Sequence, residues 1–355
     1  MEMSEKDKKQ RWKLILNIVT VSALLILCYV IRDQIAATIE NLTKVNAYAL
    51  LLILPIEFMN YDAYARMYRY LFGILGSKTK YWEMYKVSLE LNLVNHVFPS
   101  GGVSGFSYFS VRLKQLDIST GKATLVQTMK FILLFVSFEV LLVIGLICLA
   151  LGHQANGLII LIGTAIATLL MVATVGSAFL ISSERRINSF FTYITKFINR
   201  TIHMVRPKHP ETISVVRVQA TFKDLHENYL ILRNNYSLLI GPAICALIAN
   251  TTEIAAVYVV YIAFGHWVNP GAVILAYAVA NFAGLISVLP GGVGIYEALM
   301  TATLAAAGVP AAVSIPVTVM YRVLNITIQV VPGYFFYHKA LAKNDDALAA
   351  WMILF

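Results

Sequence analysis

The chain has 355 residues, of which 59% are hydrophobic and 13% are charged, and its formal net charge is +9. A globular domain usually carries about 25% charged residues, so this composition argues against a soluble enzyme and favours a protein that spans a bilayer. Nucleic acid is not needed to explain the basic balance, because membrane topology accounts for it. The cysteines Cys28, Cys148 and Cys245 lie apart in apolar runs, and no His/Cys cluster predicts a metal site.

Six apolar stretches are long enough to cross the hydrocarbon core, which takes about 20 helical residues. The first follows a basic N-terminal segment, but it is longer than a usual signal-peptide core and lacks a small-residue cleavage pattern. We therefore expect it to be a retained membrane helix. The predicted spans are 14–31, 47–73, 123–151, 157–181, 236–264 and 311–337.

Two further apolar regions, 81–111 and 271–307, are each interrupted by a glycine turn. Because their arms are short for a full crossing, each region is either a re-entrant hairpin or a pair of broken helices. Both alternatives place the two ends of a hairpin on the same side of the membrane. The turns read Pro99-Ser100-Gly101-Gly102 and Pro290-Gly291-Gly292.

Positive residues gather on one side of this arrangement. With a cytoplasmic N-terminus, 24 of the 28 Lys and Arg residues fall in cytoplasmic segments, as the positive-inside rule expects. We therefore predict a multi-pass protein of the cell membrane with both termini in the cytoplasm. Its predicted parts are an N-terminal segment 1–13, a membrane half 14–181, a basic cytoplasmic loop 182–235, a second membrane half 236–338 and a tail 339–355.

The loop 182–235 carries nine Lys and Arg residues against four Asp and Glu residues. Apolar residues recur at helical spacing from Ile187 to Val205. This pattern fits an amphipathic basic helix that lies on an anionic leaflet. It also fits an ordinary positive loop without a specific partner.

The two membrane halves share a pattern but run in opposite directions. Each glycine turn combines an upstream asparagine with a proline and a Gly-Gly-Val sequence. The first hairpin begins and ends on the cytoplasmic side, and the second begins and ends outside. We therefore predict an all-α polytopic membrane protein with about six full spans, two glycine-broken hairpins and an inverted-topology repeat. In such transporters, broken helices meet a polar group of the substrate near the midplane.

Ionisable residues inside a bilayer are costly and often mark function. Glu297 lies one turn into the helix that follows Gly292, where backbone amides stabilise a carboxylate. Arg322 lies deep in the last span and requires an anion, which could be Glu253, Glu297 or a lipid phosphate. A structural ion pair and a headgroup contact both remain open. The candidate substrate-binding residues are Glu297, Arg322, Glu253, Asn281, Gly291, Gly292, Gly101 and Gly102.

Other buried polar residues have simpler interpretations. Asn281 could join helices without touching a substrate, and Lys130 lies near a helix end from which its side chain can reach the surface. No P-loop and no HExxH or GxSxG motif occurs. We predict no catalytic residue and no cofactor.

The segment from Pro290 to Glu297, together with the turn at Pro99 and the downstream Arg322, resembles the flippase-like lysylphosphatidylglycerol synthase transmembrane family. The resemblance covers roughly 10–340 and extends to the membrane half of the multiple peptide resistance factor. The first turn departs from the family pattern, because Ser100 follows the proline and Ser104 breaks the second glycine pair.

This resemblance implies translocation or accommodation of a phospholipid or polyprenyl-linked lipid, with Glu297 and Arg322 at the matching positions. The soluble aminoacyl-transferase domain of the full-length resistance factor is absent from this sequence, so we expect no aminoacyl-phosphatidylglycerol synthase activity. The alternative is a membrane subunit or scaffold of a lipid-modifying or cell-envelope synthase. The expected partners are a membrane lipid, an anionic leaflet and either a synthase or a second copy of the chain.

Overall fold

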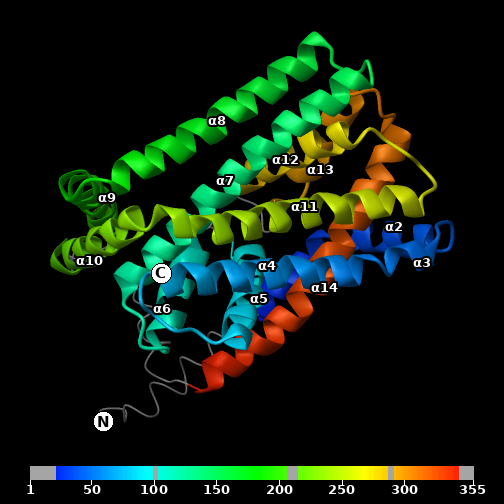
Figure 1. Ribbon diagram of the computed structural model, residues 1–355. Coiled ribbons are helices and arrows are strands. Elements are labelled where there is room, and N and C mark those ends of the chain that lie inside the picture. Colours follow the sequence, from blue (N-terminus) through cyan, green and yellow to red (C-terminus); the bar gives the residue numbers. More distant parts are fainter. Residues whose placement is uncertain (1–20, 99–102, 206–214, 287–291, 344–355) are drawn as a thin grey trace.

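The computed structural model describes residues 21–98, 103–205, 215–286 and 292–343. Helices make up this part of the chain, and it contains no strand (Figure 1). Its elements are a helix at Val21–Val30, α2 (Arg32–Leu42), α3 (Ala47–Leu50), α4 (Ile53–Ile74), α5 (Tyr81–Val97), α6 (Val103–Lys114), α7 (Thr120–Leu151), α8 (Gly157–Ile181), α9 (Glu184–Val205), α10 (Val215–Asn234), η1 (Tyr236–Leu239), α11 (Ile240–Ala263), α12 (Pro270–Ile286), α13 (Ile295–Ala306) and α14 (Ala311–Lys343).

Four described helical segments are long and apolar enough to cross a membrane: α7, α8, η1 with α11, and α14. The helix Val21–Val30 and α2 form a fifth segment that bends by 61° at Ile31. Helix α4 has 22 residues but also carries ionisable side chains, and Glu57 among them is buried against protein. The predicted polytopic helical architecture is confirmed.

Hydrogen bonds between loops define one end of the bundle. The backbone N–H of Asn46 donates to the carbonyl of Ala263 at 2.9 Å. Side-chain amides add two further links at 3.0 Å, from Asn156 to the carbonyl of Ala306 and from Asn269 to that of Cys148. We call this the Asn46 end.

A second set of contacts defines the opposite end. The Lys122 ammonium donates to the carbonyl of Leu75 at 3.1 Å, and the Ser119 hydroxyl donates to Asp224 at 2.6 Å. The imidazole of His226 lies 3.1 Å from the carbonyl of Ile181. We call this the basic end, because Lys78, Lys80, Lys114 and Lys122 lie in or beside its loops.

These two ends fix the direction of each helix. Helix α4 runs from the Asn46 end to the basic end, and α11, which packs on it, runs back (Figure 1). In the same way α7 and α14 run in opposite directions. The hairpin of α5 and α6 opens at the basic end, whereas that of α12 and α13 opens at the Asn46 end. The described helices therefore have the arrangement expected of an inverted repeat.

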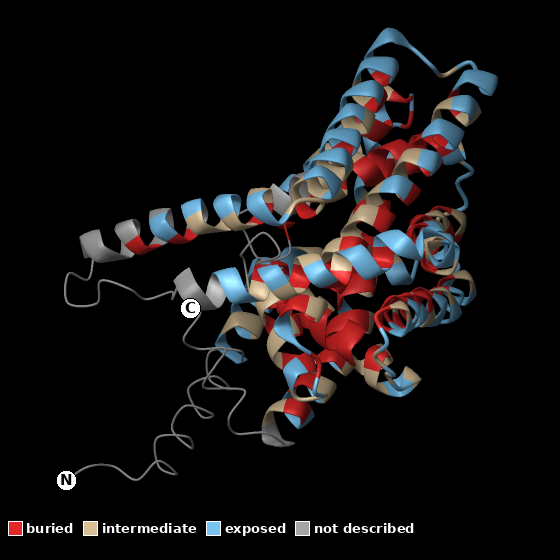
Figure 2. Cartoon of the chain, turned by 60° about the vertical axis from the view of Figure 1, so that its left-hand side comes forward, coloured by how far each residue is buried: buried red, intermediate tan, exposed pale blue. Residues whose placement is uncertain are grey.

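Each hairpin packs on a long helix of the other half: α5 on α14, and α12 on α7. Both contacts depend on glycine, since a Cβ at Gly333 would lie 2.7 Å from the carbonyl oxygen of Leu89, and a Cβ at Gly271 would overlap the backbone of Gly145. Figure 2 shows the buried residues inside the bundle, whereas α8 exposes most of its surface. The halves are thus interlocked rather than side by side.

The predicted loop 182–235 contains two helices, α9 and α10. Their contact includes stacked rings of Phe191 and Phe222, whose centroids lie 3.8 Å apart. Helix α10 packs on α7 at the basic end. Figure 1 shows α9 and α10 next to each other at the basic end of the bundle. The predicted helical spacing from Ile187 to Val205 falls within α9.

Candidate functional site

The start of α13 brings a carboxylate and a guanidinium together inside the bundle. Gly294 has a φ of 87°, a left-handed conformation that favours glycine, and its N–H donates to Glu297 Oε2 at 2.6 Å. Arg322 Nε on α14 donates to Glu297 Oε1 at 3.2 Å. The Arg322 guanidinium also lies 4.3 Å above the centre of the Tyr296 ring. The turn therefore holds Glu297 in position to neutralise the arginine.

Two further features belong to this ion pair. Gln34 of α2 donates from Nε2 to Glu297 Oε1 at 3.4 Å, so the bent N-terminal segment takes part in the site. The side chains of Arg322 and Glu297 are only 9% and 13% exposed. Charges this deep are poorly solvated. Removing one partner would therefore leave the other charge buried without compensation, which is strongly destabilising.

A second polar group lies where α4, α11 and α14 meet. Asn325 Nδ2 donates to Glu57 Oε1 at 2.8 Å and to Glu253 Oε2 at 3.5 Å. Gln329 Nε2 donates to Glu57 Oε2 at 3.1 Å, and the Tyr321 hydroxyl donates to Glu253 Oε2 at 3.0 Å. One amide of α14 thus touches two carboxyl groups from the repeat-related helices α4 and α11.

This group extends into both hairpins. From α5, Asn92 Nδ2 donates to Gln329 Oε1 and to the hydroxyl of Tyr61. From α12, the Tyr277 ring lies edge-on to the Tyr321 ring, with centroids 6.5 Å apart. Asn281 lies one turn beyond Tyr277 on α12. We call the whole assembly the central polar network. It consists of Gln34, Glu57, Tyr61, Asn92, Glu253, Tyr277, Tyr296, Glu297, Tyr321, Arg322, Asn325 and Gln329.

The structure resolves one of the alternatives for Arg322. Glu297 is its carboxylate partner, whereas Glu253 forms no ion pair within the described part of the chain. Gly292 has a φ of 67° and lies three residues before Ile295, the first residue of α13. Three other candidates, Gly101, Gly102 and Gly291, lie outside the described residues.

Glu57, Tyr321 and Gln329 were not among the candidate site residues predicted from the sequence. A signal was present, because Tyr321, Asn325 and Gln329 are spaced four apart and therefore share one face of α14. Their partners lie far away in the sequence, on α4 and α11.

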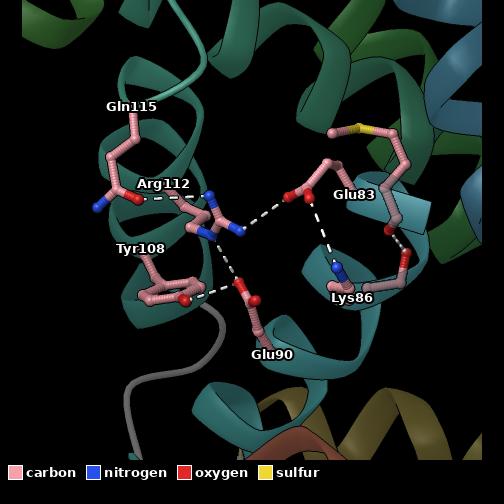
Figure 3. Close-up of polar contacts among 8 residues, drawn as sticks. Glu83, Lys86, Glu90, Tyr108, Arg112 and Gln115 are labelled. Atoms are coloured by element: carbon pink, nitrogen blue, oxygen red, sulfur yellow. Dashed lines mark hydrogen bonds and ion pairs between the residues drawn. The ribbon is translucent and has the colours of Figure 1, made fainter. Parts of the chain in front are cut away.

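A separate buried charge cluster closes the base of the first hairpin (Figure 3). Arg112 of α6 donates from Nε to Glu90 at 2.9 Å and from Nη2 to Glu83 at 3.2 Å. The Tyr108 hydroxyl donates to Glu90 at 2.8 Å. Arg112 thus clamps α6 to α5, and its side chain is only 10% exposed.

Lys130 differs from its expected position at the surface. Its ammonium lies over the rings of Tyr64, Tyr68 and Phe131, at 5.1, 5.7 and 5.1 Å from their centres. Within the described ranges it has no carboxylate partner. The electron-rich ring faces therefore take the place of an anion.

A family model matches most of the chain, and two relatives match parts of it at low identity. The family model for the lysylphosphatidylglycerol synthase transmembrane region matches residues 14–333. A UPF0104 membrane protein of Methanothermobacter thermautotrophicus is 26% identical over 120 residues, covering 34% of this chain and 36% of the relative. Another from Pyrococcus horikoshii is 23% identical over 184 residues, covering 52% of this chain and 54% of the relative. The chain thus spans about a third and about half the length of these two relatives.

Proposed function

Because this chain belongs to the lysylphosphatidylglycerol synthase transmembrane family, we propose that it binds a phospholipid or polyprenyl-linked lipid by its charged headgroup and moves it between leaflets. The observation that carries this proposal is the central polar network, which lies between two oppositely directed hairpins. A stable membrane bundle needs few such groups, because ionisable side chains in the bilayer are costly. Inverted repeats of this kind place substrate contacts at the junction of their broken helices.

Arg322 is the proposed headgroup contact. A guanidinium binds phosphate through the same fork of donors that it offers to a carboxylate. Glu297 neutralises Arg322 when no lipid is bound, and a lipid phosphate replaces it during transport. The left-handed glycines before α13 hold Glu297 close enough to return after the lipid leaves.

Purified protein in liposomes that contain a labelled anionic lipid tests this proposal. We expect the parent protein to speed the exchange of lipid between leaflets. Arg322→Ala is expected to abolish this exchange, and Arg322→Lys, which keeps the charge but loses the fork, to reduce it. Glu297→Gln is expected to slow the release step. Glu139→Gln is the control, because Glu139 lies on α7 outside the network.

The site assignment fails if Arg322→Ala and Glu297→Gln exchange lipid as fast as the parent. A parent protein that exchanges no lipid would contradict the transport proposal and favour a non-transporting subunit of a lipid synthase. Thermal unfolding in detergent shows whether each variant is folded, so that a loss of fold is not mistaken for a loss of transport.

A further inference from the structure

Glu57 and Glu253 form a carboxyl pair at the centre of the bundle. One nitrogen, Asn325 Nδ2, contacts both carboxyl groups, at 2.8 Å and 3.5 Å. The pair joins α4 to α11, the repeat-related helices that pack on each other. Glu57 is 2% exposed. Within the described ranges neither carboxyl group has a Lys, Arg or His partner.

Two adjacent carboxylates are unfavourable in such surroundings. Burial disfavours each negative charge, and the second charge repels the first. Neutral donors from Asn325, Gln329 and Tyr321 stabilise an ionised oxygen, but they supply no positive charge. The arrangement that satisfies this geometry is a carboxyl pair that shares one proton, as two carboxyls at one site generally do.

The groups that face the pair supply no positive charge that would stabilise two ionised carboxylates. Tyrosine hydroxyls are neutral near pH 7, and Arg322 is paired with Glu297. The imidazole of His96 lies near Arg322, and the Lys130 ammonium lies against Tyr64. Within the described ranges, the titratable and charged groups around the pair are Tyr61 and Tyr64 of α4, Tyr85 and His96 of α5, Lys130 of α7, Tyr277 of α12, Tyr296 and Glu297 of α13, and Tyr321 and Arg322 of α14.

We propose that Glu57 and Glu253 are a proton-binding site that couples lipid movement to proton movement, an inference that rests on the proposed function. On uptake, an O–H bond of hydronium breaks on one side of the membrane and a carboxylic O–H bond forms. On release, that carboxylic O–H bond breaks and water on the other side takes the proton as hydronium. The pair is linked to the first hairpin through Gln329 and Asn92, and to the second through Tyr321, whose ring packs edge-on against Tyr277. A rearrangement of either hairpin therefore alters the hydrogen bonds of the pair and its affinity for a proton.

The first experiment measures transport and proton flux together. Liposomes that contain the parent protein, a labelled anionic lipid and an internal pH dye are given a pH gradient. We expect the gradient to speed lipid movement in one direction and lipid movement to carry protons. Glu57→Gln and Glu253→Gln, which mimic the protonated acid, are expected to lose the effect of the gradient and the dye signal. Glu139→Gln is expected to keep both.

The second experiment detects the proton without transport. In infrared spectra of the detergent-solubilised protein, we expect a carboxylic acid C=O band at neutral pH that disappears on alkaline titration. The double variant Glu57→Gln and Glu253→Gln is expected to lose this band, whereas Glu139→Gln keeps it. If either Gln variant fails to fold, Glu57→Asp and Glu253→Asp replace it in the measurement. Both keep the acid and are expected to retain a carboxylic acid band.

The outcomes separate this inference from the proposed function. If the parent protein transports lipid at the same rate with and without the pH gradient, proton coupling is overturned and the proposed function is not. Transport that depends on Na⁺ and not on the pH gradient would also overturn it. The absence of a titrating carboxylic acid band from the parent protein would overturn the proton site. Absence of any lipid movement, with the band present, would overturn the coupling and the proposed function but leave the proton site.

Discussion

Three cations inside the described part of the bundle are compensated in different ways. Arg322 and Glu297 form a pair held by a helix start, and Arg112 lies between two glutamates. Lys130 lies among aromatic rings. Each solution removes the cost of a charge in the bundle, but only the first lies in the central polar network.

The Arg112 cluster separates a buried partner from a more exposed one (Figure 3). The Glu90 side chain is 1% exposed and that of Glu83 is 32% exposed. We expect Glu90→Gln to lower the free energy of unfolding by about 3–5 kcal/mol, because it leaves Arg112 with a weaker partner. Glu83→Gln is expected to cost about 1 kcal/mol or less.

Thermal and chemical unfolding in detergent measures these differences. Glu40→Gln is a suitable control, since Glu40 forms an exposed pair with Lys44. If Glu90→Gln and Glu83→Gln lower the free energy of unfolding equally, the buried Glu90 does not contribute more to stability than Glu83.

The sequence identifies Glu297 and Arg322 through two general rules, the stabilisation of carboxylates at helix starts and the cost of charge at depth. It could not place Lys130, because the rings of Tyr64 and Tyr68 come from a helix more than fifty residues earlier in the chain. It also could not show that Glu253 faces Glu57 rather than Arg322. These are long-range tertiary contacts, which the periodicity of the sequence does not reveal.

At the scale of elements, the contact between α5 and α14 depends on one glycine. A Cβ at Gly333 would lie 2.7 Å from the carbonyl oxygen of Leu89 and 3.1 Å from Leu93 Cβ. We expect Gly333→Ala to lower the free energy of unfolding by about 1–3 kcal/mol through overpacking. Gly176→Ala in α8, where nothing lies within 4 Å of the new Cβ, is expected to be neutral or stabilising. Unfolding in detergent distinguishes the two, and equal effects would argue against a close α5–α14 contact.

Helix α9 provides a test of the predicted contact with an anionic leaflet. Phe190 and Tyr193 are 45% and 72% exposed, and basic side chains such as Lys196 lie on the same helix. We introduce Tyr193→Trp in a background without the four native tryptophans. We expect brominated lipid chains to quench the tryptophan fluorescence of this variant. Quenching should be stronger in anionic than in zwitterionic lipid.

Adding Lys196→Glu is expected to remove much of the difference between the two lipids. Equal quenching in both lipids would indicate that charge does not hold α9 at the leaflet. Absence of quenching in either lipid would place Tyr193 away from the acyl chains.

Helix bounds were predictable wherever apolar runs were uninterrupted. The predicted span 157–181 coincides with α8, and 123–151 falls within α7. The span 47–73 is instead divided, because the short helix α3 precedes α4. The first helix continues past Arg32 after its bend. The loop 182–235 contains two helices whose packing, through Phe191 and Phe222, offsets the low intrinsic stability of isolated helices.

At the scale of the whole molecule, the opposite directions of the two halves followed from the parity of spans and from the shared glycine turns. The loop-to-loop hydrogen bonds at each end agree with that parity. The parity of the spans did not predict the exchange of packing partners, in which α5 packs on α14 and α12 packs on α7. Parity orders helices along the membrane normal but says nothing about their neighbours.

Cysteine labelling in cells tests the orientation of the whole molecule. We expect the basic end to face the cytoplasm. In a chain without Cys28, Cys148 and Cys245, single cysteines at His153 and Trp267 should react with an impermeant reagent added outside. Those at Ser77 and Asp117 should react only after permeabilisation. A reversed pattern would invert the orientation, and a mixed pattern within one end would contradict the helix directions.

The interlocked hairpins also bear on how the protein is made. Asn92 and Glu57 lie on helices that leave the ribosome well before α14, yet the amides that bond to them come from α14. Until α14 enters the bilayer, the earlier helices have to keep these polar side chains near water or against the insertion machinery. The polar network is therefore completed only when α14 arrives, and a chain truncated before α14 would be a substrate for membrane quality control.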